Sequence, residues 1–179
     1  MTAVATDQVR AREDQQGVAQ ALITSEIGGR DLQFLTEALD HGKAQLHLTE
    51  LALARGQSEK IKALGEMLAA TQAEENKKLI RIGALKGVGL PTAESTWNKA
   101  LNSKLAGLSG PKFEKRCLQQ LVEVNQRAVT AYETAARPQD TDIKAFVEQG
   151  LPLAREKLQF ASRMSGTGIS QGGRPAETK

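Results

Sequence analysis

The stretch that decides the fold is "DLQFLTEALDHGKAQLHLTELALARGQSEKIKALGEML", residues 31–68. Its first part repeats apolar or small residues at alternating spacings of three and four, which indicates a long amphipathic helix with one buried seam. The seam contains Leu32, Leu35, Leu39, Gly42, Leu46, Thr49 and Leu53. Because Gly42 has no side chain, it should let a neighbouring helix come close to this seam.

The letters "RGQSEK" predict the end of this helix and the start of a second one. Gly56 is suited to end the first helix, Ser58 to cap the next, and Glu59 to its first turn. Since the connection is short, the second helix should run back antiparallel to the first. Its apolar stripe continues to "KGVGLP", where the glycines and Pro91 stop it.

The rest of the chain predicts one short helix and two more long ones. Residues 92–109 offer Thr92 as a cap and a short helix, which we expect to form a lid across one end of the bundle with Trp97 as its packing anchor. The third long helix follows Pro111, and the fourth begins near Asp140 and contains Pro152, which should kink it. The pattern predicts an all-α, antiparallel up-down-up-down four-helix bundle with the lid helix between helices 2 and 3.

The ends of the chain differ in composition from this bundle. Residues 1–28 are polar with a weak apolar pattern, and we expect an N-terminal arm or a loosely docked helix there. Residues 29–164 should form the bundle, and residues 165–179, which are rich in Gly and Ser, a disordered tail. The arm is a candidate for self-association.

Composition restricts the partners that the protein could have. Aromatic residues make up only 3% of the 179 residues, and the 24 basic and 21 acidic residues are interspersed, whereas a nucleic-acid binder gathers its positive charge. No apolar run approaches the roughly 20 residues of a membrane span. We therefore expect no nucleic acid and no membrane span, and leave open a protein partner or self-association. The start lacks the features of a secretion signal, which predicts a cytoplasmic location if the chain is full length.

Polar residues interrupt the apolar faces of all four long helices. At about 100° per residue, Gln72 and Glu75 face the same way as Ile61 and Leu79 on the second helix, that is, into the bundle. The same geometry places further polar residues on the flanks of the other inner faces: Gln45, Asn125 and Lys157.

Two interpretations of this polar set are open. In the first, Gln45, Asn125 and Lys157 lie at the rim of the bundle, and the lysine stem extends outward to water. In the second, the residues form an internal hydrogen-bond network in which Glu75 pairs with Lys157 and fixes the helix register. An unpaired buried polar group costs roughly 1–3 kcal/mol, so a buried set has to satisfy itself or hold a ligand.

Metal binding and catalysis have few candidate residues. Helical bundles that bind metals use carboxylates and Glu-x-x-His pairs, but this chain has no such pair, and its two histidines, His41 and His47, lie six residues apart on one helix. The remaining candidate ligands are His47 and Glu75. Cys117, the single cysteine, lies in an apolar stripe without an expected histidine beside it, so it should be a buried hydrophobe. We expect no cofactor.

Three motifs at fixed places carry a resemblance to a known family: "ELALARG" (50–56), "KGVGLP" (86–91) and "IKAFVEQGLPLAREKL" (143–158). Together with the intervening spacing, they make residues 31–164 similar to the bacterial domain of unknown function 4142. The resemblance implies a ferritin-like fold and export to the periplasm or attachment to the cell envelope. The family has no established activity.

The resemblance also bears on the inner polar residues. Members of the family typically carry histidines at the places that Gln72, Asn125 and Lys157 occupy here, and a glutamate that aligns with Gln45. The resemblance therefore implies that this chain has lost the metal-binding residues at these positions. The expected function is therefore that of a non-enzymatic binding or structural accessory of the envelope, and the alternative is a metal-binding, ferritin-like protein that uses Glu75 with other carboxylates.

Overall fold

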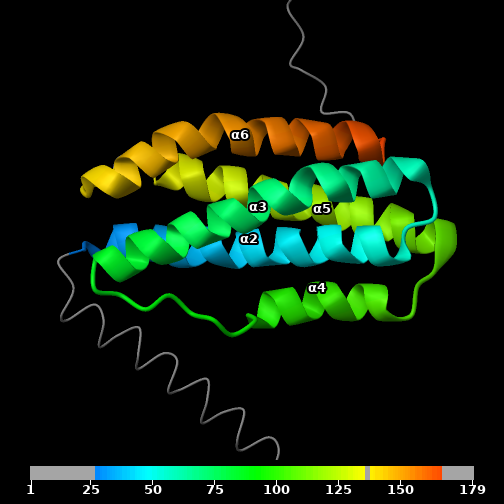
Figure 1. The fold of residues 1–179 in the computed structure, drawn as a ribbon, viewed down its shortest axis with the longest axis horizontal. Coiled ribbons are helices and arrows are strands. Elements are labelled where there is room, and N and C mark those ends of the chain that lie inside the picture. Colours follow the sequence, from blue (N-terminus) through cyan, green and yellow to red (C-terminus); the bar gives the residue numbers. More distant parts are fainter. Residues whose placement is uncertain (1–26, 136–137, 167–179) are drawn as a thin grey trace, which may run out of the picture.

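The computed structural model describes residues 27–135 and 138–166, and helices are the only regular secondary structure in these residues. Four long helices pack side by side and a shorter one lies along them (Figure 1), so the prediction of an all-α four-helix bundle is confirmed. The helices are α2 (Gly29–Arg55), α3 (Glu59–Leu85), α4 (Thr96–Ala106), α5 (Gly110–Thr134) and α6 (Thr141–Ser165). The predicted arm and the predicted tail lie almost wholly outside the described residues.

Side-chain caps fix most of the helix starts. The Ser58 hydroxyl accepts a hydrogen bond from the backbone N–H of Ile61, as predicted, and Asp140 caps α6 in the same way. Pro111 occupies the first turn of α5, also as predicted. Helix α4 differs from expectation: its cap is Ser95, whereas Thr92 lies in the preceding loop.

The directions of the four long helices are up-down-down-up. At one end of the bundle Lys86, just after α3, contacts Asp140 at the start of α6 at 2.8 Å, and Asp31 at the start of α2 accepts a hydrogen bond from the backbone of Asp140. At the other end Glu114, near the start of α5, accepts hydrogen bonds from Ser58, the cap of α3. Helices α3 and α5 therefore start at the same end and run parallel.

This order differs from the alternating order expected for the long helices, because the connection between α3 and α5 crosses the length of the bundle. Helix α3 has 27 residues, which makes it about 40 Å long. Residues 86–95 could span at most about 33 Å, and the 11 residues of α4 add about 16 Å. The chain direction does alternate at every connection once α4 is counted.

Helix α4 lies along the side of the bundle beside α2, and not across an end as expected (Figure 1). Asn98 donates hydrogen bonds to the backbone and side-chain oxygens of Asp40 on α2, and the Ser95 hydroxyl bonds the same carboxylate at 2.9 Å. Near the far end of α4, the guanidinium of Arg55 donates to the carbonyl of Leu108. These contacts connect both ends of the crossover to α2.

The interior consists of two hydrophobic clusters separated along the bundle. One lies towards the start of α2 and includes Leu35, Leu79 and Ile143. The other lies towards the end of α2 and includes Leu48 and Phe113. Burying these side chains supplies most of the driving force for folding. Between the two clusters lies a layer of polar side chains, which we call the polar layer: His41, Gln45, Gln72, Glu75, Asn76, Asn125 and Lys157.

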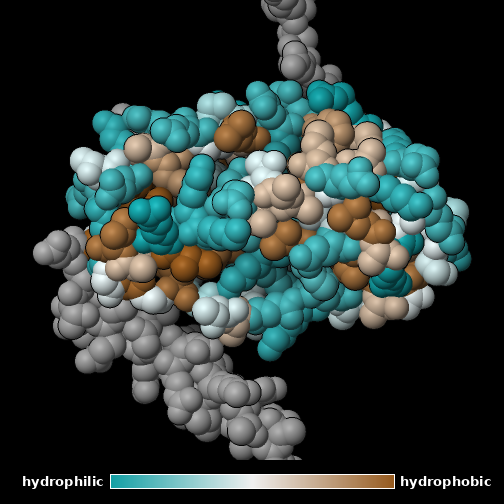
Figure 2. Space-filling view, viewed as in Figure 1, coloured by the Kyte–Doolittle hydropathy of each residue, from teal (hydrophilic) through white to brown (hydrophobic). Residues whose placement is uncertain are grey.

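Hydrophilic residues cover most of the face drawn in Figure 2, with hydrophobic residues in separate patches between them. The large hydrophobic side chains that remain most exposed include Leu85, Ile80, Met67 and Leu153. Within the described residues, no helix combines the length and the apolar character that crossing a bilayer requires.

Candidate functional site

The five residues predicted as an inner polar cluster all line one small cavity in the polar layer. The cavity has a volume of about 20 Å³ and is reached by side chains from all four long helices. The predicted residues in its lining are Gln45 on α2, Gln72 and Glu75 on α3, Asn125 on α5 and Lys157 on α6.

Lys157 provides the positive charge of the polar layer. Its ammonium nitrogen lies 2.6 Å from Oε2 of Glu75 and 3.1 Å from Oε1 of Gln72. The side chains of Lys157 and Glu75 are 11% and 19% exposed, so water screens this pair far less than a surface ion pair. Lys157 therefore joins α6 to α3 through a charge-assisted hydrogen bond.

Helices α2 and α3 approach each other closely at a pair of polar side chains on α3. Nε2 of Gln72 donates to Oδ1 of Asn76 at 3.0 Å, and both side chains are buried. They fit because Gly42 on α2 faces them: a Cβ atom at position 42 would lie 2.0 Å from Oδ1 of Asn76 and 2.8 Å from Nε2 of Gln72. The expected close approach at Gly42 is thus made by two polar side chains of α3.

The burial of these residues decides between the two interpretations of their position. Gln45 is 2% exposed and Asn125 is 1% exposed, so the interpretation that places them at the rim is wrong. Lys157 likewise directs its ammonium group to Glu75 inside the bundle. The pairing of Lys157 with Glu75 agrees with the second interpretation.

Three polar atoms of the cavity lining have no hydrogen-bond partner among the described residues: Nδ1 of His41, Nε2 of Gln45 and Oδ1 of Asn125. The amide of Asn125 is oriented by its nitrogen, which donates to the carbonyl of Leu121 at 2.7 Å. Leu121 lies one turn earlier on the same helix, so this bond does not connect Asn125 to another helix.

The structure does not bring the two metal-ligand candidates together. Glu75 lines the interior cavity, whereas His47 lines a separate pocket between α2 and α4 with Asn98 and Leu101. Across residues 27–135 and 138–166, no group of three or more His, Cys, Asp or Glu side chains could hold a metal ion. Glu75 is the one carboxylate among the residues that line the cavity.

Cys117 is fully buried in the second hydrophobic cluster, so the prediction of a buried hydrophobe is confirmed. Its thiol lies 3.6 Å from the carbonyl oxygen of Leu48. Burial raises the pKa of Cys117 to about 12, and a thiol with such a pKa is a poor nucleophile at neutral pH.

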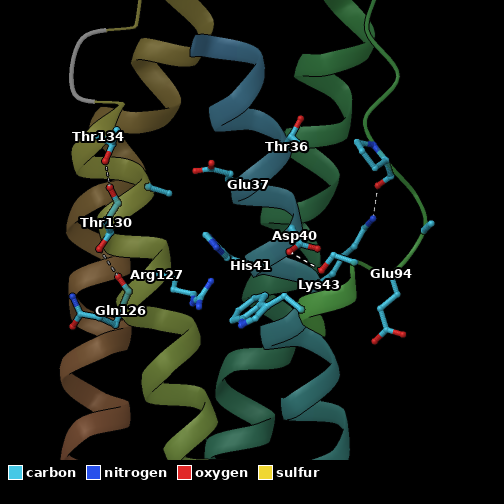
Figure 3. Close-up of a pocket in the computed structure, with 15 residues that line it drawn as sticks. Thr36, Glu37, Asp40, His41, Lys43, Glu94, Gln126, Arg127, Thr130 and Thr134 are labelled. Carbon is cyan, nitrogen blue, oxygen red and sulfur yellow. Dashed lines mark hydrogen bonds between the residues drawn. The ribbon is translucent and has the colours of Figure 1, made fainter. Parts of the chain in front are cut away.

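A larger groove lies next to the polar layer, between α2, α5 and the segment that leads into α4 (Figure 3). Its volume is about 590 Å³. The guanidinium of Arg127 lies 4.6 Å from the ring centroid of Trp97, and the ring of His41 meets the same indole edge-on at 5.5 Å. The groove's other charged residues include Glu37, Asp40, Lys43 and Glu94, which Figure 3 labels.

His41 lines both the groove and the interior cavity, so its imidazole separates the two. Sequence reasoning missed this position, as it missed Asn76 in the same layer and Tyr132 in the cavity lining. A signal was present: His41 and Gln45 are four residues apart, as are Gln72 and Asn76, and residues at that spacing share a helix face. Burial is the main reason that the pKa of His41 is lowered, with Asp40 and Glu37 acting in the opposite sense.

The lowered pKa of His41 predicts that the protein loses stability in mild acid. Above the unfolded-state pKa of about 6.5, histidine is neutral in both states. As the pH falls below that value, the unfolded chain binds a proton that the folded state resists, and unfolding becomes easier until the pH passes the folded-state pKa of His41. The loss is at most about 1.4 kcal/mol per pH unit.

Chemical denaturation between pH 7.5 and pH 5 measures this effect, and His41→Leu should flatten the profile. His47→Gln is the matched control, since His47 lies on the same helix outside the polar layer. A slope that persists in His41→Leu would assign it to other groups and contradict the prediction.

Comparisons with known proteins agree with the fold. The chain is similar to a DUF305 fragment from Deinococcus radiodurans (TM-score 0.70, 17% identity, covering 78% of this chain and 97% of that one). It is also similar to a DUF305 protein from Streptomyces coelicolor (TM-score 0.65, 17% identity, 82% and 98% covered) and to a conserved hypothetical protein from Mycobacterium tuberculosis (TM-score 0.60, 16% identity, 82% and 97% covered). At such low identities these likenesses show the fold alone. No curated protein matches the sequence.

One family model matches the sequence over residues 12–164, which is most of the chain and includes the whole bundle up to the last turn of α6. Its description is the domain of unknown function DUF4142, the family that the motifs at the end of α2, just after α3 and within α6 resemble. The protein therefore belongs to the DUF4142 family.

Proposed function

We propose that this protein is a non-enzymatic, exported binding or structural accessory of the cell envelope, in which the polar layer has a structural role. The observation that carries the proposal is the position of Lys157, whose ammonium lies 2.6 Å from the carboxylate of Glu75. A lysine side chain in this position supplies the positive charge that a metal ion would otherwise bring to the layer.

The donor set around the cavity supports this proposal against a metal centre. A transition metal prefers imidazole, thiolate or several converging carboxylates. The cavity lining offers one carboxylate, already paired with Lys157, and one imidazole, His41. A cation would have to displace the lysine or share the carboxylate with it, and like charges at that distance repel strongly in a buried site.

The reactive groups of the described residues support a role without covalent chemistry. Cys117 is fully buried among hydrophobic side chains with a raised pKa. The side chains that line the interior cavity with His41 and could act as nucleophiles are held in other states: Lys157 and Glu75 pair with each other, and burial raises the pKa of the Tyr132 phenol. A general base next to an activated nucleophile is the arrangement that covalent catalysis needs.

Export rests on the family resemblance and on one structural relative, the Streptomyces coelicolor DUF305 protein, whose description suggests secretion. The outer surface is then the part of the molecule that meets partners. It includes the 590 Å³ groove, which has the size of a small-molecule site. A protein partner or a second copy of the chain could also use the exposed side chains of α3 and α6, such as Met67 and Leu153.

The proposal predicts that the protein neither copurifies with nor is stabilised by transition metals. We expect elemental analysis of tag-free protein to find less than stoichiometric metal. Thermal melts with iron, copper, zinc or a chelator should give the same melting temperature within error, because a ligand that binds the folded state would raise it. Glu75→Gln, which removes the cavity's carboxylate, is the matched control for any metal effect.

Stoichiometric metal, or a rise in melting temperature that Glu75→Gln abolishes, would favour the alternative of a metal-binding protein that uses Glu75. A rise that survives in Glu75→Gln would place the metal elsewhere, for example at His47, and would overturn the prediction that the protein binds no transition metal.

A further inference from the structure

We propose that the cavity in the polar layer binds one ordered water molecule, held by His41, Gln45 and Asn125. The three residues line the same cavity, and each contributes one polar atom that has no partner among the described residues. Leaving three such atoms unpaired in a protein interior would be costly, and native proteins usually satisfy them with protein groups or with water. This inference is independent of the proposed function.

The size of the cavity fits one water molecule. Its volume is about 20 Å³, and a buried water needs roughly 10–15 Å³ together with two to four polar partners. A second water or a larger ligand would not fit unless the surrounding side chains moved.

The hydrogen-bonding roles of the three atoms also suit water. Oδ1 of Asn125 is an acceptor, since the nitrogen of the same amide donates to Leu121. Nε2 of Gln45 is a donor. Burial lowers the pKa of His41, so its imidazole is neutral at pH 7 and its Nδ1 can accept. A water molecule can donate to Asn125 and His41 while accepting from Gln45, which uses both of its protons and one lone pair.

Other small occupants fit less well. A cation would face the N–H group of Gln45 and the nearby ammonium of Lys157. An anion would face Oδ1 of Asn125 and the carboxylate of Glu75. A neutral molecule that both donates and accepts avoids these conflicts.

The proposed water completes the set of connections across the polar layer. Lys157 joins α6 to α3, and the close approach at Gly42 brings α2 against α3. Between α2 and α5, where His41 and Gln45 face Asn125, no direct hydrogen bond joins the polar-layer side chains that the structure describes. The water supplies that connection.

The proposal is tested by whether the substitution Gln45→Met lowers or raises the melting temperature. Gln45→Met keeps the length of the side chain but removes the N–H donor. If the water is present, it keeps only two of its three hydrogen bonds in the variant, and the melting temperature should fall by about 3 °C. If the cavity is dry, the variant removes an unpaired buried amide, and the melting temperature should stay the same or rise. Gln149→Met, an exposed position on α6, is the matched control.

A second measurement decides the question without a variant. In NMR spectra of the natural protein, the side-chain amide protons of Gln45 and Asn125 should show cross-relaxation with a water of long residence time. A high-resolution crystal structure should show the same water within hydrogen-bond distance of His41, Gln45 and Asn125. The absence of the long-lived water from the natural protein would overturn the proposal, even if Gln45→Met fails to fold.

Discussion

Lys157→Ala should lower the free energy of unfolding by about 3 kcal/mol, because it strands the carboxylate of Glu75 in the polar layer. The two side chains are only 11% and 19% exposed, and alanine cannot reach the carboxylate from α6. The variant also removes the ammonium group that donates a hydrogen bond to Oε1 of Gln72. Urea denaturation at pH 7 measures the change.

The same helix offers a matched control. Arg155 makes an ion pair of similar length, 2.8 Å, with Glu133 on α5, but the side chains of that pair are 55% and 49% exposed. Arg155→Ala should therefore change stability by no more than about 1 kcal/mol. Equal effects of Lys157→Ala and Arg155→Ala would mean that the polar layer is as well solvated as the surface.

A second variant separates the stranded charge from lost packing. In Lys157→Ala with Glu75→Gln, no unpaired charge remains, so a large part of the stability should return. If the double variant is as unstable as the sum of the two single variants, the charge of Glu75 is not the cause.

Gly42→Leu should destabilise the protein by about 3 kcal/mol, at the upper end of the usual cost of overpacking a core. Already the Cβ atom would lie 2.0 Å from Oδ1 of Asn76, and a leucine side chain is larger, so the buried side chains of α3 or the two helices would have to move apart. The added side chain also presses on Gln72 and Asn76, whose side chains hydrogen-bond to each other on α3. Thermal or chemical denaturation reports the loss.

Ala54→Leu is the control for this substitution, since Ala54 is an exposed position on the same helix. Its stability should stay within about 0.5 kcal/mol of the natural protein. In addition, Asn76→Ala removes the atom nearest to position 42, so it should be less harmful in the Gly42→Ala background than alone. Additive effects of these two changes would show that residues 42 and 76 do not compete for space.

The positions of the helices could be read from the sequence because each boundary carries a local signal. The cap at Ser58, Pro111 in a first turn and Asp140 before α6 are determined by residues within a few positions of them. The directions of the helices depend on a connection that contains a helix of its own, and no local signal states how far such a connection travels. The expected up-down-up-down order of the long helices is therefore wrong, because α4 carries the chain back along the bundle before α5 begins.

The buried face of α2 shows a second limit of periodicity. The expected seam included Leu46 and Leu53, but the structure buries Gln45 and Leu48 in preference, and Leu53 is 36% exposed. Helix α2 contacts α3 on one side and α5 on the other, so it buries a stripe wider than one seam. At the edges of that stripe, whether a side chain is polar or apolar is a poor guide to its burial. For this reason the periodicity predicts Gln45 on the flank of the inner face, whereas the structure buries it.

For the candidate site, helix rotation was sufficient to select five residues that line one cavity, because 100° per residue holds well over a single turn or two. The partners of those residues could not be selected in the same way. Whether Lys157 points out to water or in towards Glu75 depends on where α6 lies relative to α3, and His41 enters the layer only because α4 and α5 cover it from outside. Both positions depend on how the helices pack, which the local sequence pattern does not state.

The up-down-down-up order divides the bundle into two helical hairpins, α2 with α3 and α5 with α6, and this has a consequence for folding. Each hairpin brings together segments that are close in sequence, so it can form rapidly, whereas docking the two requires long loops to close. Lys157 and Glu75 are 82 residues apart and come from different hairpins. The polar layer is therefore completed only when the hairpins dock. A docking displaced by one turn would bury these charges and amides without partners, so we expect the layer to disfavour misaligned arrangements of the two hairpins.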